Sequence, residues 1–184
     1  CFLISEKLNP IEATQISNME TIINAIWVSK VSSGQKILVC GIGSIGILLL
    51  ETLKKHYNVD VYFKETNDDK IKRLLENGYK DSENQQDFDI CFNVSANEKG
   101  LQYCIDHSKN EGKIIELSWY GNKKVTLSLG TNFHYKRLQI ISSQVSELPL
   151  EKQRTESFLT RKKMAESLLS SLKITPYISI IPFE

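Results

Sequence analysis

A glycine-rich loop at residues 41–46 limits the folds open to this chain more than any other feature. Its sequence is GIGSIG, which places Gly41, Gly43 and Gly46 at the spacing G-x-G-x-x-G. The five residues before it, KILVC, are an apolar run typical of a parallel strand buried on both faces. From Ser44 onward, apolar residues recur at helical spacing. The sequence therefore predicts a strand, a tight turn and a helix in direct succession.

Each glycine of this loop has its own physical role in such a turn. Gly41 allows the tight turn, Gly43 lets a pyrophosphate approach the backbone, and Gly46 lets the helix pack closely against the strand. The first N–H groups of the helix are unpaired and attract an anion. We therefore expect the loop, together with Ser44 and Ile45, to bind the pyrophosphate of a dinucleotide.

An acidic residue is expected about 20 residues after such a loop, at the end of the second strand. Glu65 occupies this position, shortly after the second strand, which is predicted at residues 59–63 (VDVYF). A carboxylate there accepts hydrogen bonds from the ribose hydroxyls of NAD and repels the 2′-phosphate of NADP. Lys64 and Lys70 could instead pair with a phosphate. The charges favour NAD and leave NADP open.

Strands and helices alternate along most of the chain. Helices are predicted at residues 18–30, from residue 44, and at residues 69–77 and 98–108; strands are predicted at residues 36–40, 59–63, 87–94 and 113–118. This alternation is typical of βαβ units with right-handed crossovers. The chain is therefore predicted to be an α/β protein with a Rossmann-type doubly wound parallel sheet and helices on both faces.

Polar and aromatic residues follow two of the predicted strands. In an open parallel sheet, a ligand lies across the carboxyl ends of the strands. The candidate lining residues are Asn93, Val94, Ser95, Ser118, Trp119 and Tyr120. A structural role is open for each of them, because Asn and Ser often form turns and Trp119 could simply cover the sheet edge.

The alternation ends after residue 120. Residues 124–129 and 138–142 are predicted to be two further strands, and residues 151–172 one long amphipathic helix. The basic residues of this helix are expected on its solvated face: Arg154, Arg161, Lys162 and Lys163. His134 has no catalytic partner in the sequence and is expected to be a loop residue, with a role in a pocket left open.

Composition excludes several classes of protein. The chain has 184 residues, of which 41% are hydrophobic and 24% charged, as in a globular domain with one main core. No apolar run approaches the roughly 20 residues that cross a bilayer. The formal net charge is +1 without a basic block, so a nucleic-acid partner is not expected. The four separated cysteines, without zinc-ligand spacing, are expected to be buried thiols in a reducing cytoplasm.

Several segments together resemble one family. KILVCGIGSIG, Glu65 with Lys70 five places on, NVSAN, GKIIELSWYG and LQIISSQVS are similar to the coenzyme-binding domain of medium-chain dehydrogenases/reductases of the zinc-type alcohol dehydrogenase-like family. The resemblance covers most of the chain. It implies that residues 1–30 lead in from a catalytic domain that is missing here, that residues 31–150 bind NAD(P), and that residues 151–184 form a C-terminal helix and a returning strand.

The resemblance also implies an activity and roles for residues. It implies an oxidoreductase that transfers a hydride between a nicotinamide cofactor and a small alcohol or carbonyl substrate. Glu65 and Lys70 would hold the adenosine ribose, and Thr21 matches a threonine that lies near the nicotinamide in that family. The remaining nicotinamide-side contacts would come from Val94, Ser95, Ser118 and Trp119. A homodimer is compatible with the resemblance.

The zinc site of that family is not reproduced here. Most of its zinc ligands belong to a preceding GroES-like catalytic domain, so a catalytic zinc could be held there. Around Ile16 and Ser17, where the family often supplies a further ligand, this chain has no Cys, His or acid, and Glu20 is the nearest substitute. No metal ligand is therefore assigned within these residues.

Two other classes of protein use similar glycine loops. Nucleotide-sensing Rossmann domains, such as the regulatory domains of potassium channels, share the loop and the acid but lack the strands expected at residues 124–129 and 138–142. Methyltransferases that bind S-adenosylmethionine usually lack the third glycine, here Gly46. The oxidoreductase is the preferred hypothesis, and the non-catalytic sensor is the main alternative.

Overall fold

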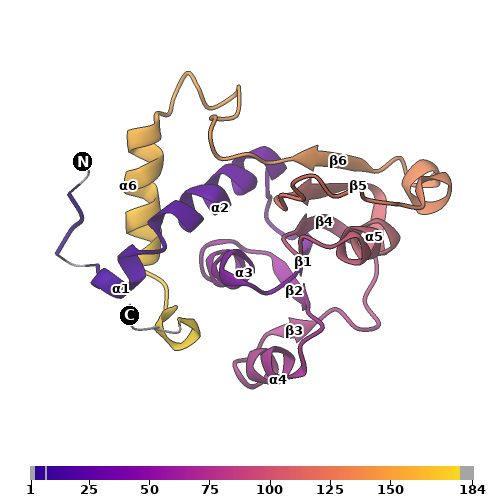
Figure 1. Ribbon diagram of the computed structural model, residues 1–184, viewed down its shortest axis with the longest axis horizontal. Helices are drawn as coiled ribbons and strands as arrows, with labels where there is room; N and C mark the ends of the chain where they lie inside the picture. Colours follow the sequence, from indigo (N-terminus) through magenta and orange to yellow (C-terminus); the bar gives the residue numbers. More distant parts are fainter. Residues whose placement is uncertain (1–2, 7, 179–184) are drawn as a thin grey trace.

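The computed structural model describes residues 3–6 and 8–178. Six parallel strands form one sheet in the order β3-β2-β1-β4-β5-β6 (Figure 1). The chain builds outward from β1 to β3 and then returns to β4 on the other side of β1. The strands are β1 (Lys36–Cys40), β2 (Asp60–Lys64), β3 (Lys80–Asp81), β4 (Phe88–Asn93), β5 (Ser108–Glu116) and β6 (Gln139–Ser142). This is the Rossmann strand order, and it confirms the predicted fold.

Helices cover both faces of this sheet (Figure 1). The helices α2 (Ile16–Ser29) and α3 (Ser44–His56) cover one face, and α5 (Glu98–His107) covers the other. The helix α4 (Asp68–Glu76) lies near β3, α6 (Phe158–Leu169) packs against α2, and α1 (Pro10–Ala13) is a single short turn. Within the described ranges, no helix is long and apolar enough to span a bilayer.

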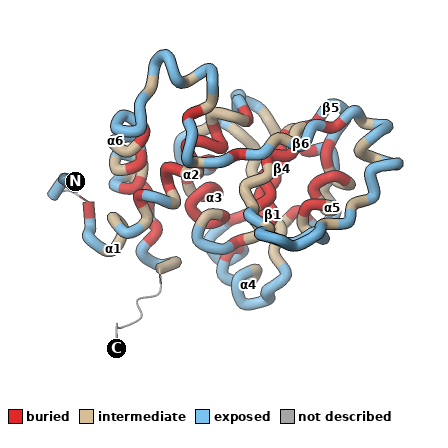
Figure 2. The backbone as a smooth tube through the Cα atoms, turned by 45° about the horizontal axis from the view of Figure 1, so that its top comes forward, coloured by how far each residue is buried: buried red, intermediate tan, exposed pale blue. Residues whose placement is uncertain are grey.

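Alternation along the central strand divides the core into two layers. Ile37 and Val39 of β1 belong to the core shared with α2 and α3, whereas Leu38 and Cys40 belong to the core shared with α5. Successive side chains of a strand point to opposite faces, so KILVC serves both layers. Figure 2 shows the buried residues concentrated in β1, β4 and the helices that face them. The glycine loop therefore directly follows a strand that is buried on both faces.

The prediction of a strand at residues 124–129 is wrong. This segment pairs with no strand, and Val125 and Leu127 pack partly buried against the α5 layer. Its backbone N–H groups bond to side chains of α5 instead: that of Thr126 donates to Glu98 at 3.2 Å and that of Ser128 to Gln102 at 2.8 Å. One-sided packing of an extended chain produces the same apolar alternation as a strand. Of the two strands expected here, only β6 is present.

The predicted helix over residues 151–172 is also too long. Ser157 and Thr160 form a capping box that begins α6 at Phe158, and the residues between Pro149 and this cap form turns. Arg161 is not on a solvated face, because it is only 4% exposed. Of the four basic residues predicted to lie on the solvated face, Arg161 is thus the one that is buried.

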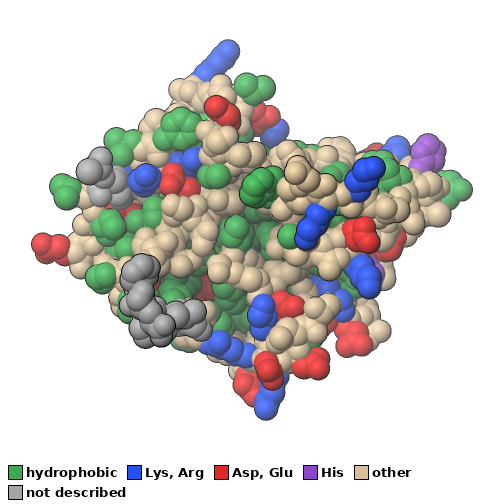
Figure 3. Space-filling model, viewed as in Figure 1, with side chains coloured by type: hydrophobic (Ala, Val, Ile, Leu, Met, Phe, Trp, Pro, Cys, Tyr) green, Lys and Arg blue, Asp and Glu red, His purple; other side chains and the backbone are tan. Residues whose placement is uncertain are grey.

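Other differences are smaller. The two-residue strand β3 was not expected, and β5 begins earlier than predicted, at Ser108, with an irregularity opposite Phe88 to Ile90. Cys40, Cys91 and Cys104 are buried free thiols, as expected. The returning strand expected near the C-terminus lies outside the described residues. On the face drawn in Figure 3, basic and acidic side chains are interspersed.

Candidate cofactor-binding site

The three glycines of the loop meet different surroundings. A Cβ atom on Gly41, whose φ is +98°, would lie 2.6 Å from the Cα of Ser95. A Cβ atom on Gly46 would lie 2.1 Å from the carbonyl oxygen of Gly41, whereas one on Gly43 would meet no atom within 4 Å. The first and third glycines are therefore required for packing. The second faces open space at the N-terminus of α3, where a ligand can approach the backbone.

Glu65 braces the glycine loop against the turn after β2. One carboxylate oxygen, Oε2, accepts the N–H of Ile42 at 3.0 Å, and the other, Oε1, accepts those of Thr66 at 2.7 Å and Asn67 at 3.1 Å. The ammonium of Lys70 lies 3.6 Å from Oε2. A carboxylate has about four lone-pair sites, so Oε2 keeps capacity for one further hydrogen bond. Glu65 directly follows β2, which is the position predicted from the sequence, whereas its contacts with the glycine loop were not predicted.

These contacts set the charge state of Glu65. Burial alone would raise the pKa of this carboxyl, but the N–H groups of Thr66, Asn67 and Ile42 and the charge of Lys70 lower the pKa below its ordinary value. Glu65 is therefore ionised at neutral pH. A negative charge stands at the place expected to meet the adenosine ribose.

A cavity of about 480 Å³ opens beside the loop. It brings together six of the residues proposed from the sequence: Gly41, Gly43, Glu65, Lys70, Val94 and Ser95. Its other lining residues were not expected as a set: Cys40, Ile42, Lys64, Thr66, Asn97, Lys99, Gly100 and Tyr103. Several of these come from the first turns of α5. The expectation that a ligand lies across the carboxyl ends of the strands predicts them only if it also includes the helix that follows each strand.

A smaller hollow of about 260 Å³ lies on the α4 side of the same loop. Gly43, Ser44 and Lys70 line it together with Arg73 and Tyr177, the latter from the short helix at Thr175–Tyr177. The guanidinium of Arg73 stacks over the Tyr177 ring at 4.8 Å. Ser44 is the first residue of α3 and borders this hollow.

Polar side chains are linked at the carboxyl ends of β4 and β5. The buried amide nitrogen of Asn93 donates to Glu116 at 2.7 Å and to the Tyr120 hydroxyl at 3.0 Å, and its oxygen accepts the Ser95 hydroxyl at 2.7 Å. The Ser118 hydroxyl accepts the N–H of Ala96 at 3.0 Å. Burial and then the charge of Glu116 raise the pKa of Tyr120 to about 12. This network fixes the loops that carry Ser95 and Ser118.

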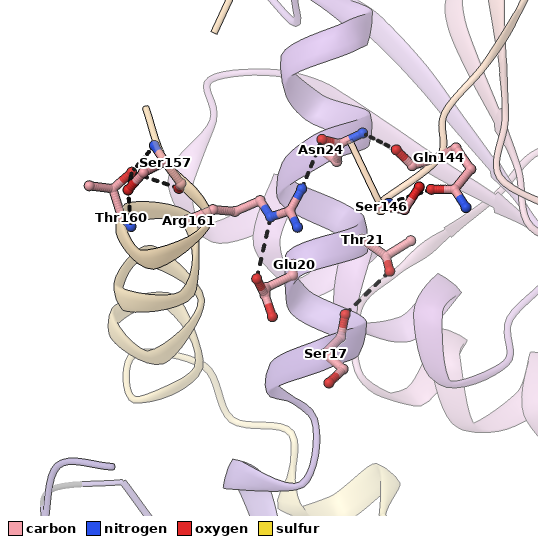
Figure 4. A network of polar contacts seen from close by, with 9 residues as sticks. All are labelled: Ser17, Glu20, Thr21, Asn24, Gln144, Ser146, Ser157, Thr160 and Arg161. Atoms are coloured by element: carbon pink, nitrogen blue, oxygen red, sulfur yellow. Dashed lines mark hydrogen bonds and ion pairs between the residues drawn. The ribbon is translucent and has the colours of Figure 1, made fainter. Parts of the chain in front are cut away.

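Six predicted residues do not line the glycine-loop cavity: Ser44, which borders the smaller hollow, and Gly46, Ser118, Ile45, Trp119 and Thr21. Ile45 is partly buried in the core, and Trp119 is 90% exposed. Thr21 lies on α2, where its hydroxyl donates to the carbonyl oxygen of Ser17 at 3.2 Å (Figure 4). Ile45 therefore contributes packing, whereas the positions of Thr21 and Trp119 leave their proposed contacts untested.

Glu20 has a structural partner instead of a metal. Its carboxylate accepts the Nε–H of Arg161 at 3.4 Å, and Arg161 also donates to Asn24 at 3.2 Å (Figure 4). Figure 4 shows Thr21 projecting from the side of α2 away from Arg161. In the described part of the chain, no three His, Cys, Asp or Glu side chains are grouped so as to hold a metal ion.

A parallel sheet with a dinucleotide-type loop at its switch point defines a Rossmann domain. No protein-family model and no curated protein matches the sequence. Among solved structures, galactitol-1-phosphate dehydrogenase from Escherichia coli is similar, with a TM-score of 0.77 and 13% identity, over 97% of this chain and 55% of that one. A short chain alcohol dehydrogenase from E. coli CFT073, complexed with NADH, is also similar. Its TM-score is 0.73 at 18% identity, over 94% of this chain and 52% of that one.

A third similar structure is a zinc-binding dehydrogenase from Sinorhizobium meliloti 1021 bound to NADP. Its TM-score is 0.73 at 17% identity, over 95% of this chain and 53% of that one. At these identities the likeness establishes the fold. The chain spans about half the length of each of these dehydrogenases.

Proposed function

We propose that this chain is the coenzyme-binding domain of an NAD(P)-dependent oxidoreductase of the alcohol or polyol dehydrogenase kind. The glycine loop carries this proposal. Gly43 faces open space at a helix N-terminus, while Gly41 and Gly46 are packed too closely for any side chain. The backbone is thus bare where a pyrophosphate must approach. The fold shared with dehydrogenases complexed with NADH or bound to NADP supports the same assignment.

The cavity residues fit the parts of a dinucleotide. The N–H groups at Gly43 and Ser44 would hold the pyrophosphate, with Ile45 supporting the first turn of α3. Glu65 would accept a hydrogen bond from the adenosine ribose through its free lone pair, beside Lys70. We favour NAD, because the ionised Glu65 opposes an additional phosphate.

The nicotinamide half would lie toward the carboxyl ends of β4 and β5. Val94, Ser95 and Ser118 would flank it there, and Trp119 and Thr21 are the more distant candidates. A bound nicotinamide cofactor supplies the hydride-transfer chemistry. The residues of this chain would orient the cofactor, and the Asn93 network would keep the flanking loops in place.

The residues of this domain do not fit a catalytic zinc, because Glu20 is bound to Arg161 and no ligand group is present in the described ranges. No step is therefore derived through a metal. We propose that residues 1–30 connect to a catalytic domain, that residues 31–150 bind the cofactor and that residues 151–184 return to the catalytic domain. That domain would bind a small alcohol or carbonyl substrate. A cytoplasmic location fits the three buried free thiols.

The test is a titration of the chain with NADH, followed by energy transfer from Trp27 and Trp119 to the reduced nicotinamide. Gly43→Val should abolish binding, because its side chain fills the space for the pyrophosphate without meeting protein atoms. Gly130→Val is the matched control, since a Cβ atom there also meets open space. Unchanged affinity in Gly43→Val would contradict the site.

A further inference from the structure

Another hollow lies between the end of α2, the strands β5 and β6, and the turn at residues 149–152. Its volume is about 340 Å³, which falls within the roughly 300–1,000 Å³ of small-molecule sites. It shares no lining residue with the two cavities beside the glycine loop. The register of the sheet aligns its residue Lys113 with Ile37, near the start of β1, whereas the glycine loop follows the end of β1. The hollow is therefore separate from the proposed cofactor site.

One wall of this hollow is apolar. Trp27, Val28 and Ile141 are half-buried there and pack against the core shared with α2 and α3. Leu150, which is 83% exposed, borders the hollow from the turn at residues 149–152. A ring placed against this wall would remove apolar surface from water, and paired aromatic rings gain more than their buried area alone provides. The wall therefore suits an aromatic group.

The rest of the lining carries positive charge. The ammonium of Lys30 pairs with the carboxylate of Glu151 at 2.5 Å. The ammonium of Lys152 lies 5.4 Å from the centre of the Trp27 ring. In the part of the chain that the structure describes, neither Lys113 nor Lys152 forms an ion pair with a carboxylate. The hollow thus contains two ammonium groups without an acidic partner.

Lys113 has hydrogen-bonding capacity for a ligand. Its half-buried side chain leaves β5 and donates to the carbonyl oxygen of Ser29, in the last turn of α2, at the long distance of 3.4 Å. An ammonium has three N–H donors, so two remain after this contact. A charge that is partly removed from water attracts an anion more strongly than a fully hydrated one. Lys113 is therefore placed to bind an anionic group.

We propose that this hollow binds a small aromatic carboxylate. The ring would lie against Trp27 and Ile141, and the carboxylate would pair with Lys113 and Lys152. Both oxygens of a carboxylate accept hydrogen bonds, so one carboxylate can meet two ammonium groups. This site is additional to the proposed cofactor site and does not depend on the activity proposed for the chain.

The test is a calorimetric titration of the chain with 2-naphthoate, and with 2-naphthamide as the matched uncharged probe. The wild type should bind 2-naphthoate at least about tenfold more tightly, the effect of one charge-assisted hydrogen bond. Lys113→Met and Lys152→Met should each remove most of this difference without weakening 2-naphthamide. Trp27→Leu should weaken both probes about fivefold, because the ring contact is lost. Lys99→Met, which removes an ammonium from the glycine-loop cavity, should change neither affinity.

Each other result would overturn the proposal. Equal affinity of the wild type for the two probes, or no binding of 2-naphthoate, would show that the lysines do not recognise a carboxylate. Unchanged affinity in both lysine variants would place the probe elsewhere on the protein, and a loss in Lys99→Met would place it in the glycine-loop cavity. Unfolding temperatures are measured alongside, because Lys113 also contacts α2. If Lys113→Met does not fold, Lys152→Met, in the turn at residues 149–152, decides the test.

Discussion

A side chain on Gly46 would collide with the carbonyl oxygen of Gly41, because a Cβ atom built there lies 2.1 Å from that oxygen. This contact joins the first turn of α3 to the end of β1. A Cβ atom on Gly43, three residues earlier, meets nothing within 4 Å. One loop thus contains a glycine needed for packing and a glycine available to a ligand.

Gly46→Ala is therefore expected to lower the free energy of unfolding by about 1–3 kcal/mol, because α3 must move away from β1 to make room. Gly43→Ala should stay within about 1 kcal/mol of the wild type, since only a helix cap is altered. Urea denaturation of both variants measures the difference. Equal stabilities would show that the close approach of α3 is not needed.

A second prediction concerns the buried pair between α2 and α6. Arg161→Met leaves the carboxylate of Glu20 buried without its partner, so the free energy of unfolding should fall by about 3–5 kcal/mol. The double variant with Glu20→Gln should recover much of this loss, because no uncompensated charge remains. Lys163→Met, on an exposed position of the same helix, is the control. Additive losses in the double variant would contradict the coupling.

The sequence predicted the sheet well because each local signal agreed with the fold. KILVC, the glycine loop and the acid at Glu65 belong to one continuous strand, turn, helix and strand unit within residues 36–65. The expectation that a ligand lies at the carboxyl ends of the strands indicated Val94 and Ser95, and both line the same cavity. Periodicity and loop chemistry were sufficient to indicate these residues of the cavity.

The remaining features depend on contacts between distant segments. Residues 124–129 alternate like a strand, but their backbone groups bond to side chains of α5, which no local pattern reveals. Arg161 is buried because Glu20 and Asn24, far away in the sequence, accept its hydrogen bonds. Lys99 and Tyr103 reach the cavity only because α5 packs beside β1. Tertiary packing decided each of these cases.

A third prediction follows from the lowered pKa of Glu65. Its folded-state pKa lies below the ordinary value of 4.5, so the stability that the carboxylate contributes is present above that pH. It is lost as the pH falls through the folded-state pKa. The unfolding temperature of the wild type should exceed that of Glu65→Gln at pH 7, and the gap should narrow below about pH 4.5. A gap independent of pH would show that the ionised form does not brace the loop.

Cofactor choice gives a fourth prediction. Glu65→Ser removes both the acceptor for the ribose hydroxyls and the charge that opposes a 2′-phosphate. NAD binding should weaken, and the ratio of NADP to NAD affinity should rise about fivefold, as expected for the removal of a repulsion of about 1 kcal/mol. Calorimetric titration with both cofactors measures the ratio. A wild-type preference for NADP would mean that Lys64, Lys70 or Lys99 dominates the ribose end of the cavity.

The last prediction separates binding from catalysis. Hydride transfer needs a closed site and an electrophile or acid at the substrate oxygen, and the described residues hold no metal-ligand group that could supply the electrophile. This chain should therefore bind NADH without oxidising it in the presence of aldehydes or ketones, while a longer form that includes a catalytic domain should turn over. The reaction is followed by the absorbance of the reduced nicotinamide, with each compound of a carbonyl panel offered as the substrate. Robust turnover by the 184 residues alone would refute the need for a second domain and would direct attention to His134 and Glu20. Binding without turnover in both forms would instead support a nucleotide-sensing role.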